Sequence, residues 1–168
     1  MFIALTTLML ATTPPVALPS ESGQNADFAV IQLAVPDVDG LIKQWAVPGA
    51  GVEITTTNRL VRDKATFTAI VFKGCMTDPK GDCHVTARYQ ITDPDGQPYE
   101  GKANDPPRPV YDGKPVAAPN LQLGGAFFGL RIEHGEALGA YLVRIETTDV
   151  VSHRTIITQS VLTAVEAE

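Results

Sequence analysis

The chain has 168 residues and a formal net charge of −6, with 44% hydrophobic and 19% charged residues. This length fits a single domain that can bury a core, and the composition is that of an ordinary globular protein. The 13 Lys and Arg residues are scattered and form no basic run. Nucleic acids and anionic membrane surfaces need a clustered positive face, so we expect neither as a partner.

The N-terminal residues are apolar and carry no charged side chain before Glu21. The apolar block over residues 1–11 is too short to span a bilayer, which takes about 20 residues, but it has the length of a signal-peptide core. We predict a signal peptide over residues 1–19, with a buried N-terminal strand as the alternative. A flexible linker is expected over residues 20–26, and no transmembrane segment in the mature chain. The predicted location is periplasmic or secreted, in a bacterium.

Short runs rich in β-branched and aromatic residues follow one another along residues 27–168, separated by turn residues. The alternation of apolar and polar residues is clearest in residues 84–92. The other runs are residues 27–35, 51–57, 64–72, 127–133, 140–148 and 154–165. Only residues 37–47 suit a helical turn. The pattern predicts an all-β domain, an antiparallel sandwich of about seven to eight strands.

Residues 96–120 break this pattern, because they hold six of the 13 prolines and show almost no apolar periodicity. Proline has no amide hydrogen to donate, so this segment cannot form a central strand. We predict a long Pro-rich loop over residues 97–119. It is either a functional insertion or a surface meander with one short edge strand around Val110.

The two cysteines, Cys75 and Cys83, lie between two predicted strands, and His84 follows directly. Their spacing matches neither covalent haem attachment nor a thioredoxin-like redox pair. Structural zinc needs four ligands, and the chain lacks the paired spacings of zinc modules. We predict a disulfide at the neck of a β-hairpin made by residues 64–72 and 84–92, since an even cysteine count is typical of exported proteins. No cofactor is expected.

Residues 136–149 resemble the penultimate strand of immunoglobulin-like and fibronectin-III-like sandwiches. In those domains a small residue stands two positions before a tyrosine and the strand then alternates inward, as Gly139, Tyr141, Val143 and Ile145 do here. The resemblance covers about residues 50–166 and implies an Ig-like fold in which the Tyr141 hydroxyl bonds to backbone upstream. The layout is also similar to that of small exported bacterial proteins.

The leading interpretation is a non-enzymatic exported binding or accessory module that recognises a protein or envelope component through its loops. Ser152 and His153 adjoin Asp149, but neighbours in one turn rarely reach the geometry of a catalytic triad. The predicted binding residues are Met76, Asp78 and Lys80 between the cysteines, Tyr99, Arg108 and Tyr111 in the Pro-rich segment, and Phe127.

Two other interpretations stay open. The first is a metal-binding periplasmic protein or hydrolase, because an Ig-like layout brings the loops that hold His84, His153 and Asp149 to the same end of the sandwich. The second is a structural subunit of an envelope assembly, in which residues 154–165 form an exposed edge that accepts a further strand.

Overall fold

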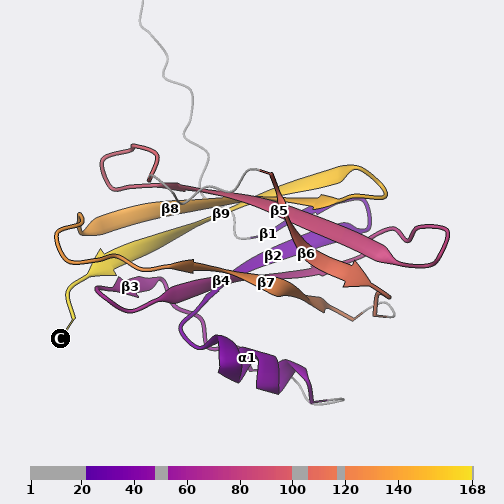
Figure 1. The fold of residues 1–168 in the computed structure, drawn as a ribbon, viewed down its shortest axis with the longest axis horizontal. Helices are drawn as coiled ribbons and strands as arrows, with labels where there is room; N and C mark the ends of the chain where they lie inside the picture. Colours follow the sequence, from indigo (N-terminus) through magenta and orange to yellow (C-terminus); the bar gives the residue numbers. More distant parts are fainter. Residues whose placement is uncertain (1–21, 48–52, 100–105, 117–119, 168) are drawn as a thin grey trace, which may run out of the picture.

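The computed structural model describes residues 22–47, 53–99, 106–116 and 120–167. They form two stacked sheets, with one short helix below the lower sheet (Figure 1). One sheet has the order β1-β2-β4-β7 and the other the order β3-β9-β8-β5-β6, which confirms the predicted all-β class. The elements are β1 (Ser22–Asn25), β2 (Phe28–Val35), α1 (Val38–Trp45), β3 (Arg59–Val61), β4 (Thr66–Lys73), β5 (Cys83–Thr92), β6 (Arg108–Gly113), β7 (Gln122–Leu130), β8 (Gly139–Asp149) and β9 (Arg154–Val165).

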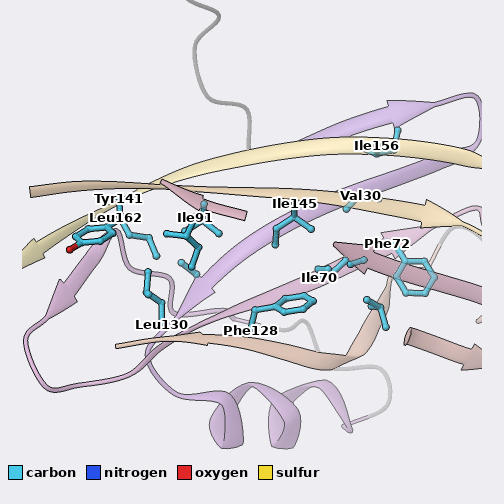
Figure 2. Packing of buried hydrophobic residues seen from close by; sticks show 14 of the residues in the cluster. Val30, Ile70, Phe72, Ile91, Phe128, Leu130, Tyr141, Ile145, Ile156 and Leu162 are labelled. Atoms are coloured by element: carbon cyan, nitrogen blue, oxygen red, sulfur yellow. The ribbon is translucent and has the colours of Figure 1, made fainter. Parts of the chain in front are cut away.

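Alternation along the strands decides which side chains are buried between the sheets. In β8 every second residue from Tyr141 onward is buried, and the residues between them are partly exposed. Of these, Tyr141, Val143 and Ile145 meet Phe72 and Phe128 from the opposite sheet in one apolar cluster (Figure 2). Burying a side chain of this size stabilises the folded state by about 1.5–3 kcal/mol, so the alternating pattern fixes the sandwich.

One polar group lies inside this core. The side chain of Gln32 on β2 is only 1% exposed. Its amide nitrogen donates to Ser160 Oγ over 2.7 Å and to the Val143 carbonyl oxygen over 3.3 Å, and its amide oxygen accepts from Thr158 Oγ1 over 2.8 Å. A buried amide is tolerated only when it is hydrogen-bonded, and these bonds link the two sheets across the core.

Helix α1 covers part of the outer face of the β2-β4-β7 sheet. Asp37 caps its first turn by accepting a hydrogen bond from the Gly40 amide over 2.9 Å. Leu41 is buried against Val35 and Ala69, in a second apolar cluster outside the sandwich core. The expected helical turn over residues 37–47 is therefore a helix of eight residues. Among the residues that the structure describes, no helix has the length and apolar character needed to cross a membrane.

The predicted hairpin of residues 64–72 and 84–92 is wrong. β4 pairs with β2 and β7, whereas β5 pairs with β6 and β8 in the other sheet. Residues 74–82 therefore carry the chain from one sheet to the other. Only an isolated bridge between Thr77 and Cys83 has the antiparallel pairing that the hairpin required.

Two further predicted segments differ from the structure. Residues 22–25, expected within a flexible linker, form β1 and pair with β2. Residues 53–57, part of a predicted strand, carry no strand because they cross between the sheets, with the Thr57 amide donating to the Ala34 carbonyl oxygen over 2.9 Å. β3 starts later and runs parallel to β9. The predicted signal peptide lies outside the described residues.

The predictions for the Pro-rich segment and for the last strand agree with the structure only in part. β6 lies within the predicted loop, at the edge of its sheet, as the edge-strand alternative for that loop anticipated. β9 lies between β3 and β8. The prediction of an exposed edge over residues 154–165 is therefore wrong for residues 163–165, which pair with β3.

The hydrogen bond implied for Tyr141 is present. Its hydroxyl donates to the carbonyl oxygen of Ala137 over 2.8 Å. The ring of Tyr99 packs edge-on against that of Tyr141, with centroids 5.5 Å apart, and the Tyr99 hydroxyl donates to Glu136. These contacts fix the chain at the start of β8, at the end of the sandwich away from the disulfide.

Glycines allow the two sheets to approach each other at both sides of the sandwich. A Cβ atom on Gly124 of β7 would lie 2.4 Å from Val110 Cγ1 of β6. A Cβ atom on Gly23 of β1 would lie 2.6 Å from Ile156 Cγ2 of β9. Both distances are shorter than any normal carbon–carbon contact, so larger residues would push the sheets apart.

We expect Gly124→Ala to lower the free energy of unfolding by about 1–3 kcal/mol, because the new methyl group overlaps the buried Val110 side chain. Gly125→Ala is the matched control, since its Cβ would lie 3.7 Å from the nearest atom, the Val110 carbonyl oxygen. The control should change stability by less than about 1 kcal/mol. Urea unfolding of both variants measures the difference, and equal effects would contradict this account of the β6–β7 contact.

Candidate binding site at the disulfide end

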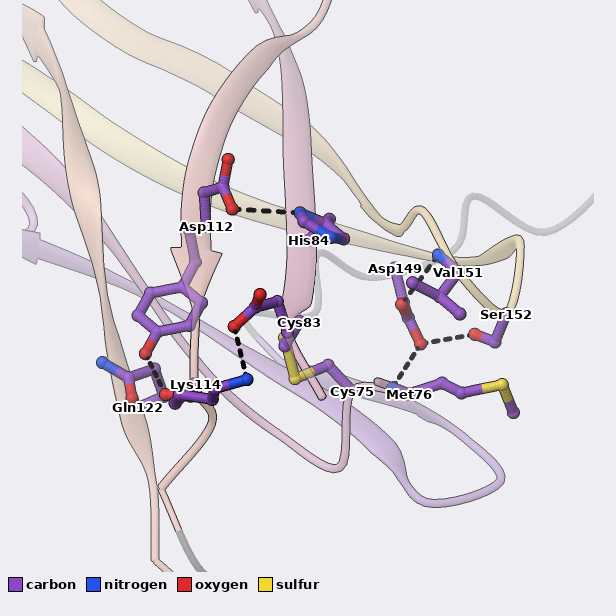
Figure 3. The surroundings of a disulfide bond; sticks show 12 residues. Cys75, Met76, Cys83, His84, Asp112, Lys114, Gln122, Asp149, Val151 and Ser152 are labelled. Carbon is purple, nitrogen blue, oxygen red and sulfur yellow. Dashed lines mark hydrogen bonds and ion pairs between the residues drawn. A yellow bond between two sulfur atoms is a disulfide. The ribbon is translucent and has the colours of Figure 1, made fainter. Parts of the chain in front are cut away.

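A disulfide between Cys75 and Cys83 closes the crossing from β4 to β5 (Figure 3). The two Cα atoms are 6.0 Å apart. Cys83 is fully buried, and Cys75 packs against the core from its edge. The predicted disulfide is confirmed, although it joins the segment after β4 to the first residue of β5 in the other sheet instead of two strands of a hairpin. Closing a loop of this size contributes about 2–3 kcal/mol in the chain-entropy model.

A buried carboxylate joins the disulfide loop to the turn between β8 and β9. Asp149 is fully buried, and its oxygens accept hydrogen bonds from the Met76 amide over 2.9 Å, the Val151 amide over 3.2 Å and the Ser152 hydroxyl over 2.5 Å. Figure 3 shows these bonds converging on one side chain. The two loops therefore lie at the same end of the sandwich, as the sequence analysis expected.

Asp78 organises the turn inside the disulfide loop. Its Oδ1 atom accepts from the Asp82 amide over 2.9 Å and from the Lys80 amide over 2.8 Å. The Asp82 amide above all, with help from His84 and the Lys80 amide, holds the pKa of the Asp78 carboxyl below its usual value. The stabilisation that these hydrogen bonds give the turn is fully present when the pH is above the usual carboxyl pKa. It is lost as the pH falls through the lowered pKa of Asp78.

Two of the three candidate metal ligands, His84 and Asp149, have other partners in the structure. His84 Nε2 lies 3.4 Å from Asp78 Oδ2, and His84 Nδ1 lies 3.1 Å from Asp112 Oδ1. Asp149 uses its oxygens to hold the two loops, and His153 is an exposed residue of the β8–β9 turn with a φ of 58°. Within the described ranges, no three His, Cys, Asp or Glu side chains are placed to hold a metal ion.

The predicted binding residues of the disulfide loop lie at its surface. The Met76 side chain is 46% exposed, and Lys80 is exposed. The ammonium group of Lys114 binds the Lys80 carbonyl oxygen and lies 3.0 Å from Asp82 Oδ1, which ties the loop to the chain after β6. These residues share one end of the molecule, whereas Arg108 is exposed at the start of β6.

The three aromatic residues predicted as anchors take part in packing. Tyr99 contacts the core and bonds to Glu136, the Tyr111 ring lies edge-on to Phe72, and Phe127 belongs to the cluster under α1. All three are only partly exposed. Their role in binding stays a prediction, and the structure gives each of them a role in the fold.

A hollow of about 450 Å³ opens beside the disulfide. Its apolar lining residues are Phe72, Cys75, Pro115 and Val116, and its polar lining residues are Asp27, Lys73, Asn120 and Gln122, with Gly74 between them. Gly74 has a φ of +72°, and a Cβ atom there would lie 1.9 Å from the Asp27 carbonyl oxygen. Glycine is required at this position because of both the left-handed backbone and the close approach.

A second hollow, also of about 450 Å³, lies next to the first and shares Lys73 with it. Its other lining residues are Ser22, Gly23, Gln24, Ala29, Val30, Ile31 and Leu121. Of the residues that line the two hollows, Cys75 was predicted in the disulfide, and Pro115 and Val116 lie in the predicted Pro-rich loop. None of the other lining residues was predicted as a site residue. No local motif marks them, because several segments far apart in the chain supply the walls.

No protein-family model and no curated protein matches the chain. A solved structure that is similar in part is a family 123 glycoside hydrolase from Clostridium perfringens, described for glycolipid glycan hydrolysis. It has 10% sequence identity and a TM-score of 0.46, and the match covers 82% of this chain and 28% of that chain. The present chain thus spans less than a third of the hydrolase. A likeness at this level carries no argument about function.

We expect Asp149→Asn to lower the free energy of unfolding by about 2–3 kcal/mol, because an amide group would face backbone donors where a carboxylate now accepts. Asp112→Asn is the matched control, since the Asp112 side chain is 76% exposed and its 3.1 Å contact with His84 lies at the surface. The control should cost less than about 1 kcal/mol. Urea unfolding and hydrogen exchange at the Met76 amide measure both, and a stable, fully protected Asp149→Asn protein would contradict this role.

Proposed function

We propose that the chain is a non-enzymatic exported binding or accessory module that recognises a protein or envelope component with its disulfide end. The observation that carries this proposal is the apolar hollow of about 450 Å³ beside the disulfide. Binding sites in proteins are concave, mostly apolar and supplied with a few polar groups at fixed positions, and this hollow has those properties.

The interactions that hold the loops at the disulfide end in place favour binding. The disulfide and the Asp149 hydrogen bonds hold the two loops next to the hollow in one arrangement. A surface that is ordered before a partner arrives loses little conformational freedom when the partner binds. The same bonds support a module that recognises its partner without rearranging.

The partners of the polar residues support a non-enzymatic role. In a serine hydrolase the nucleophile bonds to a histidine, which in turn bonds to an acid. Here the Ser152 hydroxyl bonds directly to Asp149, and His84 lies between two other carboxylates. These groups therefore serve to hold loops in place.

Two observations support an exported Ig-like module. The disulfide is of a kind that persists in oxidising compartments such as the periplasm or the extracellular space. The packing of two sheets and the bond from Tyr141 to Ala137 agree with the Ig-like layout that the sequence resembles.

Partner capture from the cell envelope tests the proposal. The tagged full chain, expressed in its native cells, is compared with Val116→Arg, which places a charged side chain in the hollow. Val161→Arg is the matched control, because Val161 has a similar exposure, 38% against 44%, but lies on β9 outside both hollows. Wild type and control should retain the same envelope component, and Val116→Arg should lose at least about tenfold in recovery.

Equal recovery of that component by all three proteins would overturn the proposed site. Recovery of no component above background by the wild-type chain would overturn the proposed function. Circular dichroism of the purified variants shows whether Val116→Arg is folded, and the exposure of Val116 leads us to expect that it is.

A further inference from the structure

Residues 106–109 form an exposed Pro-Pro-Arg-Pro stretch that the proposed function does not use. All four residues are exposed, and the last two are the first residues of β6. β6 is the final strand of its sheet and pairs only with β5. The side of β6 opposite β5 carries no further strand, so a partner can reach this stretch.

Proline fixes the conformation of this stretch before any partner binds. Its ring holds φ at about −65°, and a residue that precedes proline is restricted to extended conformations. These two constraints act on all four residues, because prolines stand at positions 106, 107 and 109. The polyproline II helix has three residues per turn, so Pro106 and Pro109 lie on the same side of it. A groove that recognises this helix therefore meets a segment that loses little conformational freedom on binding.

The chain after the stretch anchors it to the core. Val110 is 3% exposed and belongs to the core cluster. The ring of Tyr111 lies edge-on to that of Phe72, with centroids 5.5 Å apart. Residues 108 and 109 also pair with β5. The rigid body of the protein thus holds the exposed prolines in one place.

Arg108 adds a positive charge that has no counterpart within the described ranges. Its side chain forms no hydrogen bond or ion pair with the residues that the structure describes. By contrast, Arg131 lies 2.7 Å from Glu133, and Arg144 lies 2.6 Å from Glu146. A guanidinium group binds a carboxylate with two parallel hydrogen bonds, so Arg108 is complementary to an acidic residue of a partner.

We propose that residues 106–109 are a ligand segment for a partner protein, which binds them in a groove lined by aromatic side chains and bordered by a carboxylate. Pro106 and Pro109 pack on the aromatic rings, and Arg108 pairs with the carboxylate. This surface goes beyond the proposed function. It lies at the first residues of β6, whereas the disulfide end lies beside the last one, Gly113, which pairs with Cys83.

Titration of the full chain with an isolated SH3 domain, followed by NMR, tests the proposal. The probe is an SH3 domain that prefers an arginine next to its Pro-x-x-Pro ligand. We expect saturable binding by the wild-type chain and a loss of at least about tenfold in affinity for Pro106→Ala/Pro109→Ala. Arg108→Ala should also bind less tightly, and its affinity should depend less on salt concentration, because the screened ion pair is gone.

Two variants elsewhere on the surface serve as matched controls. Pro36→Ala removes an exposed proline between β2 and α1, and Arg131→Ala removes an arginine whose side chain is 54% exposed. Both should bind the SH3 domain as the wild-type chain does. Circular dichroism shows whether each variant is folded, and the exposure of the replaced residues leads us to expect that it is.

No saturable binding by the wild-type chain, or equal affinity of Pro106→Ala/Pro109→Ala and the wild type, would overturn the proposal. Equal affinity of Arg108→Ala would overturn the role of Arg108. Prolines also protect edge strands from pairing with other chains. If the double variant self-associates in sizing chromatography but binds the SH3 domain unchanged, edge protection is the role of the prolines and the ligand segment is wrong. Val116→Arg leaves residues 106–109 unchanged, so the capture experiment for the proposed function fails or succeeds separately.

Discussion

The passage of the chain from β4 in one sheet to β5 in the other is the constraint on which this end of the molecule depends. Residues 74–82 make that passage without a strand ladder along them, so other interactions have to hold them. The disulfide fixes the two ends of the passage, the buried Asp149 holds its start, and Asp78 closes its turn. Each interaction replaces hydrogen bonds that a continuous sheet would have supplied.

The same constraint creates the surface on which the functional proposal rests. Where the chain leaves β4, the sandwich is open at its end, and the hollow forms between Phe72, the disulfide and the residues after β6. An opening of this kind lowers packing density and would weaken a loosely held loop. With the loop held by covalent and charged contacts, the opening persists as a shaped apolar surface that a partner can fill.

Much of the fold follows from local sequence patterns, and the pairing of its strands does not. Alternation identified most strands, and two cysteines around a turn identified the disulfide, because both are short-range signals. Turn residues between 72 and 83 show that the chain reverses, but they do not say which sheet the next strand joins, and this is why the hairpin was wrong. The hollow was missed for a similar reason, since Phe72 and Gln122 meet only through the pairing of β4 with β7.

The central claim is that a partner contacts the disulfide end of the sandwich. Hydrogen–deuterium exchange of the full chain, with and without the captured envelope component, measures this most directly. The account predicts slower exchange in residues 72–76 and 120–122 when the partner is bound. Slower exchange confined to the outer faces of β8 and β9, with no change beside the disulfide, would contradict it.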